Sequence, residues 1–326
     1  VEYSVLVTVT LAFILKIAIY KDGDKLTDEL SLLHQIAAER NVSLEKVQEA
    51  RAVLARICGS RQCQIGRPFG NVTVPHYRAT GYNVTACPIP KNMSTVLVAI
   101  LCALSEWETF VRQKRMVTKD GHNGLCKGRN TFDDIYHRHE NYYEPGSPYR
   151  NILLVRDPIE RFLSAFYSKC IGTRWSPPNS CHGCYDDLEC VIREQQRRNM
   201  VRPEGKIPMT ISQWHMSPQT WYCEMASHQS SYRVLRYASN DTAGIVEQLH
   251  DVFTEAGIEQ DRQMWMYEQM RRESADHATK HLDGLASYRS LLHSRPDLIE
   301  VLVRMYFYDY LLFSIPFPSA FIASPA

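Results

Sequence analysis

The sequence carries almost no excess charge of either sign. Its 37 Lys and Arg residues are matched by 36 Asp and Glu residues, which leaves a formal net charge of +1. A protein that coats nucleic acid needs a broad basic surface, so this balance argues against that class and predicts no nucleic-acid partner. Any site for an anionic ligand must therefore be assembled locally from a few cations.

Internal repeats and low-complexity tracts are also missing. The composition is 44% hydrophobic and 22% charged, which excludes a disordered or fibrous chain. A length of 326 residues allows one large α/β domain or two small ones, with a sizeable core.

Cysteine, in contrast, is plentiful. The chain has ten Cys residues, and N-x-S/T sequons occur at Asn41, Asn71, Asn83, Asn92 and Asn240. Together these features favour the secretory pathway, where disulfides form and asparagine is glycosylated.

A short apolar segment stands at the start of the sequence. Residues 3–15 carry no charge, Lys16 follows, and residues 17–20 are again apolar. A membrane-spanning helix needs about 20 apolar residues, and a Lys near its end can reach the interface. We expect residues 1–20 to be a signal-anchor or signal segment; the alternative is a buried strand or helix.

Residues 21–82 have the pattern of a stem and helical lead-in. Apolar residues recur at helical spacing over 26–58, with an interruption at 41–43 after which Ser43 is placed to cap a second helix. Residues 67–82 have the composition of a linker. We expect the catalytic domain to occupy residues 83–326.

Two strand–loop–helix units follow. Residues 83–89 and 151–155 are predicted strands, and residues 95–104 and 160–169 are the helices after them. This order predicts an α/β fold with a central parallel sheet and flanking helices, and ligands at the carboxyl ends of the strands. The C-terminal third is predicted to be mostly helical, with helices over 245–256 and 298–313.

The first loop has the composition of an anion site. Lys91, Ser94 and Thr95 surround the start of a helix, where unpaired backbone N–H groups and the helix dipole favour a phosphate or sulfate. The glycines of a Walker loop are absent. The alternative is an ordinary turn with a surface Lys.

The second loop offers a guanidinium and a hydroxyl. Arg156 ends the second strand, and Ser164 lies about two turns into the following helix. Such a pair suits a second phosphate. The alternative is an ion pair of Arg156 with Asp157 or Glu160, and Arg161 is expected to be structural.

These motifs resemble a known family. P-K-x-x-S-T at 90–95 and R-D-P-x-x-R-x-x-S at 156–164 are similar to the 5′-phosphosulfate and 3′-phosphate motifs of sulfotransferases. Over residues 83–318 the chain more narrowly resembles the Golgi carbohydrate sulfotransferases of the chondroitin type. The segments that carry this resemblance are LLVRDPIERFLSAFYSKC, HMSPQTWYC and YFYDYLLF.

The resemblance implies a P-loop-like sulfotransferase fold that uses adenosine 3′-phosphate 5′-phosphosulfate (PAPS) and no metal. It implies a glycan acceptor, either a chondroitin-like glycosaminoglycan or a glycoprotein glycan, and a single-pass type II Golgi membrane protein with a lumenal catalytic domain. Lys91, Ser94 and Thr95 would hold the 5′-phosphosulfate, and Arg156 and Ser164 the 3′-phosphate. Glycosylation of Asn92 would block that site, so we expect Asn92 to be bare.

The acceptor hydroxyl also needs a base. His215, which matches the H-x-x-P segment of the family, is the first candidate because an imidazole accepts a proton near neutral pH. The other candidates are His122, His137, His139, Glu106 and Asp157.

The cysteines allow two interpretations. Cys181 and Cys184 have the spacing of half a zinc site, but no second C-x-x-C stands at finger spacing, and disulfides are favoured. Cys58 and Cys63 could pair with each other, and the other connectivities stay open.

Two other functions compete with the sulfotransferase. A P-loop-like kinase or nucleotide hydrolase is disfavoured because the Walker glycines and a magnesium-binding carboxylate pattern are missing. A sulfotransferase-like protein that binds glycans without catalysis is the second alternative.

Overall fold

The computed structural model describes residues 25–59, 64–132, 150–171, 180–201, 209–272 and 283–322. The chain divides into two compact units, one made of residues 1–64 and 317–326 and the other of Ile65–Pro316. Residues 1–20, where the membrane segment is predicted, lie outside the described residues. Within the described ranges, no helix combines the length and apolarity needed to cross a bilayer.

The smaller unit is a helical hairpin closed by the C-terminal tail. Helices α2 (Lys25–Glu39) and α3 (Leu44–Cys58) pack together, and the 3-10 turn Ser319–Phe321 packs on α3. The predicted cap is confirmed, since the Ser43 hydroxyl accepts a hydrogen bond from the Lys46 backbone N–H. The Lys46 ammonium lies 4.6 Å from the centre of the Phe317 ring, which ties the tail to α3.

The larger unit is built on a five-stranded sheet of order β3-β1-β2-β4-β5. The strands are β1 (His76–Ala79), β2 (Val84–Cys87), β3 (Thr131–Phe132), β4 (Arg150–Val155) and β5 (Tyr232–Arg236). β2, β4 and β5 run parallel, as predicted, whereas β1 is antiparallel to both β2 and β3. The sheet is therefore mixed: parallel around the predicted strands and antiparallel at one edge.

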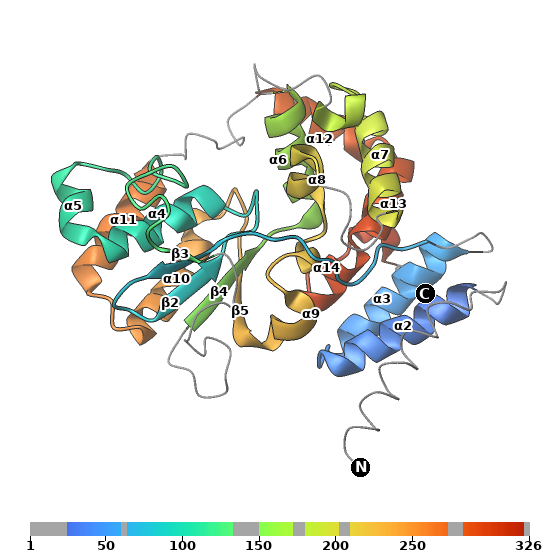
Figure 1. Cartoon of the computed structure of the whole chain (residues 1–326). Coiled ribbons are helices and arrows are strands. Elements are labelled where there is room, and N and C mark those ends of the chain that lie inside the picture. Colours follow the sequence, from blue (N-terminus) through green and yellow to red (C-terminus); the bar gives the residue numbers. More distant parts are fainter. Residues whose placement is uncertain are drawn as a thin grey trace, which may run out of the picture. The chain divides into compact units, whose positions relative to one another are not determined.

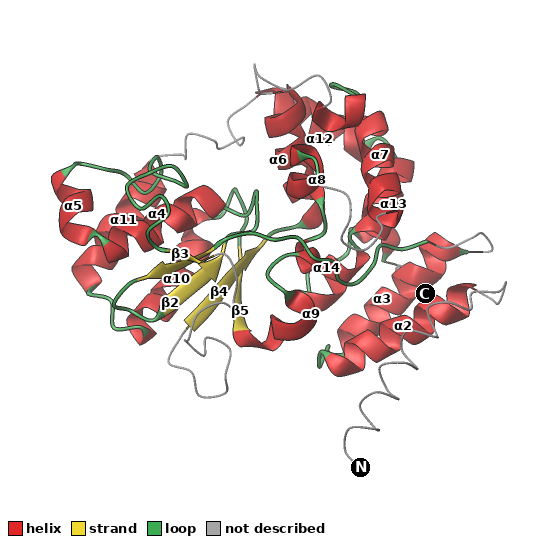
Figure 2. Cartoon of the chain, viewed as in Figure 1, coloured by secondary structure: helices red, strands yellow, loops and turns green. Residues whose placement is uncertain are grey.

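Helices surround this sheet (Figures 1 and 2). They are α4 (Ser94–Ser105), α5 (Trp107–Arg112), α6 (Pro158–Phe166), α7 (Leu188–Val201), α8 (Ile211–Met216), α9 (Met225–His228), α10 (Thr242–Glu255), α11 (Gln260–Arg272), α12 (Asp283–His293), α13 (Pro296–Met305) and α14 (Phe307–Leu312). Helix α4 packs on β1 and β2, and α10 packs on β5 and α11. Helices α8, α12 and α13 pack on α6, which continues from β4.

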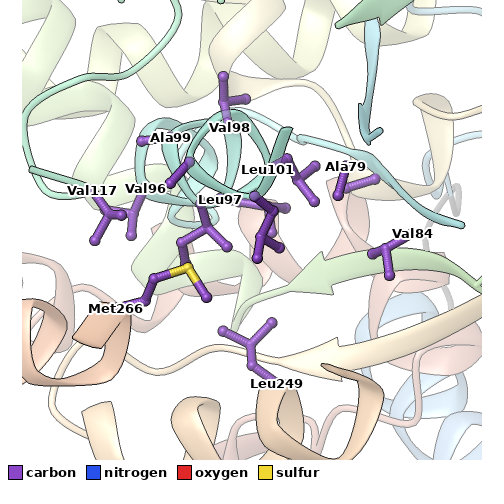
Figure 3. Packing of buried hydrophobic residues seen from close by; sticks show 14 of the residues in the cluster. Ala79, Val84, Val96, Leu97, Val98, Ala99, Leu101, Val117, Leu249 and Met266 are labelled. Atoms are coloured by element: carbon purple, nitrogen blue, oxygen red, sulfur yellow. The ribbon is translucent and has the colours of Figure 1, made fainter. Parts of the chain in front are cut away.

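The main core lies between α4 and the sheet. Residues 96–104 of α4 are all buried, which is why this helix has no polar face in the sequence. In Figure 3, Leu97 points from α4 towards Met266 and Leu249. Because α4 is fixed on every side, its first turn has a defined place beside the end of β2.

Two predicted segments differ from the structure. Residues 298–313 form α13 and α14 rather than one helix; the break is at Tyr306, whose hydroxyl donates to the Met216 carbonyl at 2.6 Å. Strand β1 lies within the segment whose composition suggested a linker, upstream of residue 83, where we expected the catalytic domain to begin. A strand with the sequence HYRA has little of the apolar pattern that identifies strands.

The cysteines form disulfides, as favoured from the sequence. The pairs among the described residues are Cys87–Cys223, Cys102–Cys126, Cys170–Cys181 and Cys184–Cys190. Cys58 is also disulfide-bonded, and Cys63 lies outside the described residues. Cys181 and Cys184 belong to different pairs, so the zinc interpretation of this segment is wrong.

Candidate functional site

The turn between β2 and α4 holds the first predicted anion site. Parallel pairing of β2 with β4 aligns Cys87 with Leu153, so the turns that follow the two strands begin side by side. Lys91 and Met93 adopt left-handed backbone conformations, with φ of 69° and 59°. Such conformations are uncommon for residues other than glycine, and here they turn the chain sharply into α4 without the glycines of a Walker loop.

Asn92 fixes this turn from inside. Its side chain is only 1% exposed, and its Nδ2 donates to the Leu154 carbonyl and to Gln219 Oε1, each at 2.7 Å. In the folded chain this amide is inaccessible, which supports the prediction that Asn92 carries no glycan. Asn92 therefore has a structural role, although it lies in a sequon.

Arg156 lies at the end of β4, as predicted. Its guanidinium is 5% exposed and donates to the Lys91 carbonyl at 3.3 Å and to the Ser239 hydroxyl at 3.2 Å. Its Nε is buried and has no hydrogen-bond partner among the described residues. The Glu160 carboxylate is 3.7 Å from Nη2 but is held by two hydrogen bonds of 2.7 Å from Arg289. Arg156 thus keeps a donor for a further acceptor.

Helix α6 begins directly after Arg156. Asp157 is its N-cap and accepts from the Glu160 backbone N–H at 2.8 Å, and Pro158 occupies the first turn. Ser164 lies in this helix and is buried. A π-helical segment, Tyr167–Ile171, continues α6 and carries Lys169. Segments of this kind occur frequently at functional sites.

Lys91 has a strongly lowered pKa. Burial, and after it the positive charges of Lys169, Arg156 and Arg161, lower this pKa from its ordinary value to about 7. Among the described residues, none accepts a hydrogen bond from its ammonium or forms an ion pair with it. A buried ammonium surrounded by other cations is stabilised by a bound anion, so the residues present fit a phosphate or sulfate ligand.

His215 lies on α8 within the field of the same cations. Its Nδ1 donates to the Ile211 carbonyl at 2.7 Å, which leaves the lone pair on Nε2. Burial and the charges of Lys169, Lys91 and Arg161 lower the pKa of His215 to about 3, although the bond to Ile211 opposes the shift. The imidazole is therefore neutral and can accept a proton at Nε2.

Ser94 and Thr95 occupy the first turn of α4. A side chain added at Gly121 would lie 2.5 Å from Thr95 Cγ2, so the loop after α5 covers this turn closely. Lys91, Ser94 and Thr95 thus lie on the turn after β2 and the start of α4. Arg156 lies at the end of β4, and His215 lies on α8, which packs on α6.

The other candidate bases fit less well. Glu106 ends α4 at the far end from Ser94 and forms an ion pair of 3.5 Å with Arg129. Asp157 is occupied as the α6 cap, and burial raises its pKa. His122 is exposed, and its Nδ1 lies 3.0 Å from the Tyr77 hydroxyl. His137 and His139 lie outside the described residues.

Three further residues near these turns are Arg161, which was expected to be structural, and Gln219 and Asp309, for which the sequence indicated no role. The fully buried guanidinium of Arg161 donates to the carbonyls of Pro90 at 3.0 Å and Ser217 at 2.7 Å, and to the Tyr222 hydroxyl at 3.2 Å. It therefore joins the β2–α4 turn to the segment after α8. Gln219 adjoins the H-x-x-P segment, and only that position could have drawn attention to it.

Comparisons with known proteins agree with this geometry. The sulfotransferase family profile matches residues 76–316. In Caenorhabditis elegans, "Carbohydrate sulfotransferase chst-1" is 23% identical over 305 residues, covering 91% of this chain and 90% of that protein. The protein C18B2.2 is 27% identical over 260 residues, covering 78% and 73%. "Putative sulfotransferase vep-2" is 22% identical over 213 residues, covering 64% and 66%.

No solved structure matches the chain significantly. The family profile spans the sheet, the turns after β2 and β4, and α14, which is the greater part of the sequence. The chain belongs to the sulfotransferase family.

Proposed function

We propose that this protein transfers a sulfuryl group from PAPS to a hydroxyl of a glycan, either a chondroitin-like glycosaminoglycan or the glycan of a glycoprotein. The name of the relative that aligns over most of both chains, a carbohydrate sulfotransferase, supports a carbohydrate acceptor. The disulfides and sequons support a lumenal catalytic domain, which we place in the Golgi behind a single N-terminal membrane segment.

The observation that carries this proposal is the Lys91 ammonium, which belongs to a half-buried side chain at the β2–α4 turn and has its pKa lowered by burial and by nearby cations. We assign Lys91, Ser94 and Thr95 to the 5′-phosphosulfate and Arg156 and Ser164 to the 3′-phosphate. PAPS supplies an activated sulfuryl group bound to a good leaving phosphate. Lys91 stabilises the charge that develops on that phosphate, a role for which no metal is needed in principle.

His215 is our candidate base. Its Nδ1–H bond to Ile211 holds the imidazole in one tautomer, so that Nε2 is available to accept the proton of the acceptor hydroxyl. Burial is the largest cause of the lowered pKa of His215, and the charges of Lys169, Lys91 and Arg161 add to it; a bound polyanion offsets the part due to these charges and so raises the pKa. The base therefore becomes stronger when the nucleotide site is filled.

Transfer of radiolabelled sulfate from PAPS to a panel of desulfated glycosaminoglycans and deglycosylated or intact glycoproteins tests the function. We expect labelling of at least one glycan class. Lys91→Ala should lower kcat by about 10²–10³, because it removes charge stabilisation that grows in the transition state. Absence of transfer to every acceptor, with PAPS bound, would favour the non-catalytic glycan-binding alternative.

The pKa of Lys91 makes nucleotide binding depend on pH. An anion binds the protonated ammonium, so affinity for adenosine 3′,5′-bisphosphate should fall as pH rises from 7 to 9, by at most about tenfold per unit. The phosphates of the ligand, with a second pKa of about 6, stay ionised over that range. Calorimetry in buffers of different ionisation enthalpy should detect proton uptake. Lys91→Met should abolish it; uptake that persists in this variant would exclude Lys91 as the titrating group.

Substitutions of Arg156 and of His215 should change different kinetic constants. Arg156→Ala should raise the KM for PAPS by about 10–100-fold, since a charge-assisted contact present before and during transfer is lost.

His215→Gln should lower kcat by about 10²–10⁴ and leave bisphosphate affinity unchanged. Arg193→Ala, at an exposed position of α7, is the matched control and should change neither constant. If His215→Gln keeps near-normal turnover, another residue is the base.

A further inference from the structure

We propose that Gln219 is a positioning residue that sets the spacing between the two anion-binding turns and thereby lets one nucleotide engage both. The inference rests on the proposed function, because it assigns the two turns to the two phosphate-bearing ends of one ligand. Gln219 does not itself contact the anions in this account.

The contacts of one side-chain amide carry the inference. Gln219 Oε1 accepts from Asn92 Nδ2 at 2.7 Å and from the Arg156 backbone N–H at 3.0 Å. Gln219 Nε2 donates to the Arg156 carbonyl at 2.9 Å. Asn92 is the neighbour of Lys91, and Arg156 carries the guanidinium of the second turn. A single planar amide therefore joins the backbone of one turn to the side chain at the centre of the other.

Strand pairing alone does not hold the turns at this distance. The β2–β4 register ends at the pair Cys87–Leu153, before either Lys91 or Arg156. Beyond that pair, three bonds among the described residues tie β4 and its turn to the first turn: Asn92 to the Leu154 carbonyl, Arg156 to the Lys91 carbonyl, and Arg161 of α6 to the Pro90 carbonyl. The Gln219 amide differs from these because one side chain bonds to both turns.

Gln219 is itself rigidly held. It starts the 3-10 turn Gln219–Trp221, and its backbone N–H donates to Asp309 Oδ2 at 2.8 Å, while the Thr220 N–H donates to Asp309 Oδ1 at 2.9 Å. Gln219 and Asp309 are both 0% exposed. Asp309 lies on α14, so the core of the C-terminal helices fixes the position of the amide. A buried network in which the amide's donors and acceptors are used specifies one geometry.

The chemistry of the side chain is also specific. The Gln219 amide nitrogen is a donor that faces the Arg156 carbonyl and the Asp309 carboxylate. A glutamate at position 219 would place an acceptor oxygen there instead. Methionine has a similar length and fills the same space but forms none of these bonds. Gln219→Met therefore tests the hydrogen bonds with little change in packing volume.

The experiment compares three ligands by calorimetry: adenosine 3′,5′-bisphosphate, adenosine 5′-monophosphate and adenosine 3′-monophosphate. In the wild type, the bisphosphate should bind more tightly than either monophosphate, since its second phosphate binds at high effective concentration. In Gln219→Met, the bisphosphate should weaken by about tenfold, equivalent to about 1.4 kcal/mol, and each monophosphate by less than about threefold.

Gln263→Met is the matched control. Gln263 is 2% exposed, its Nε2 donates to the Ile258 carbonyl at 2.8 Å, and its Oε1 bonds to His250 at 2.9 Å, within the α10–α11 pair. The same substitution there should lower the melting temperature and leave all three affinities unchanged. Should Gln219→Met not fold, Asn92→Ala removes the same contact from the opposite side, together with the bond of Asn92 to the Leu154 carbonyl, and should likewise weaken the bisphosphate more than either monophosphate.

Two results would overturn the inference. If Gln219→Met keeps the wild-type advantage of the bisphosphate, or weakens all three ligands equally, Gln219 supports the fold without setting the spacing. If the wild type itself shows no preference for the bisphosphate, the proposed function fails, and with it the assignment of Gln219. If the wild type prefers the bisphosphate and only Gln219→Met and Asn92→Ala lose this preference, the result supports both the proposed function and the role of Gln219.

Discussion

The parallel pairing of β2 with β4 is the constraint on which the site depends. Both strands end at the same edge of the sheet, so the turns that carry Lys91 and Arg156 emerge next to each other. Helix α4 is buried along its length against the sheet, and α6 is anchored by its own N-cap and by the helices around it. The two turns are therefore short segments between fixed elements, and their side chains have little freedom to move apart.

The concentration of positive charge at this edge has an energetic cost in the absence of a ligand. Lys91, Arg156, Arg161 and Lys169 are gathered in a chain whose formal net charge is only +1. Burial lowers the pKa of Lys91 and of Arg156, which means that the charged forms are destabilised by the protein. Under the proposed function, a bound anion offsets the part of that cost that comes from repulsion between the cations, so the arrangement that destabilises the free protein strengthens binding.

The sequence predicted the parts of the site that follow local rules. An apolar strand, a polar turn with Lys91 and an apolar helix identified the β2–α4 unit, and Arg156-Asp157-Pro158 identified the start of α6. Strand β1 was missed because its four residues have no apolar pattern, and the break at Tyr306 was missed because it depends on a bond to Met216.

Long-range contacts explain what the sequence could not show. The bonds of Gln219 to Asn92 and to Asp309 join residues that are far apart in the chain, and no spacing rule connects them. Arg161 was assigned a structural role from its helical spacing, but the carbonyls it binds could be known only from the fold. Motifs thus located the groups that we propose bind the ligand, whereas the residues that position those groups could be identified only from the structure.

The central claim is that this edge of the sheet binds a nucleotide with phosphates at both the 3′ and 5′ positions. The most direct measurement is the melting temperature of the protein with adenosine 3′,5′-bisphosphate and, separately, with ATP at the same concentration. A ligand that binds only the native state stabilises it by RT ln(1 + [L]/Kd), where [L] is the free ligand concentration, and so raises the melting temperature. The account predicts a clear rise with the bisphosphate and a much smaller one with ATP, whereas equal stabilisation by the two nucleotides would contradict it.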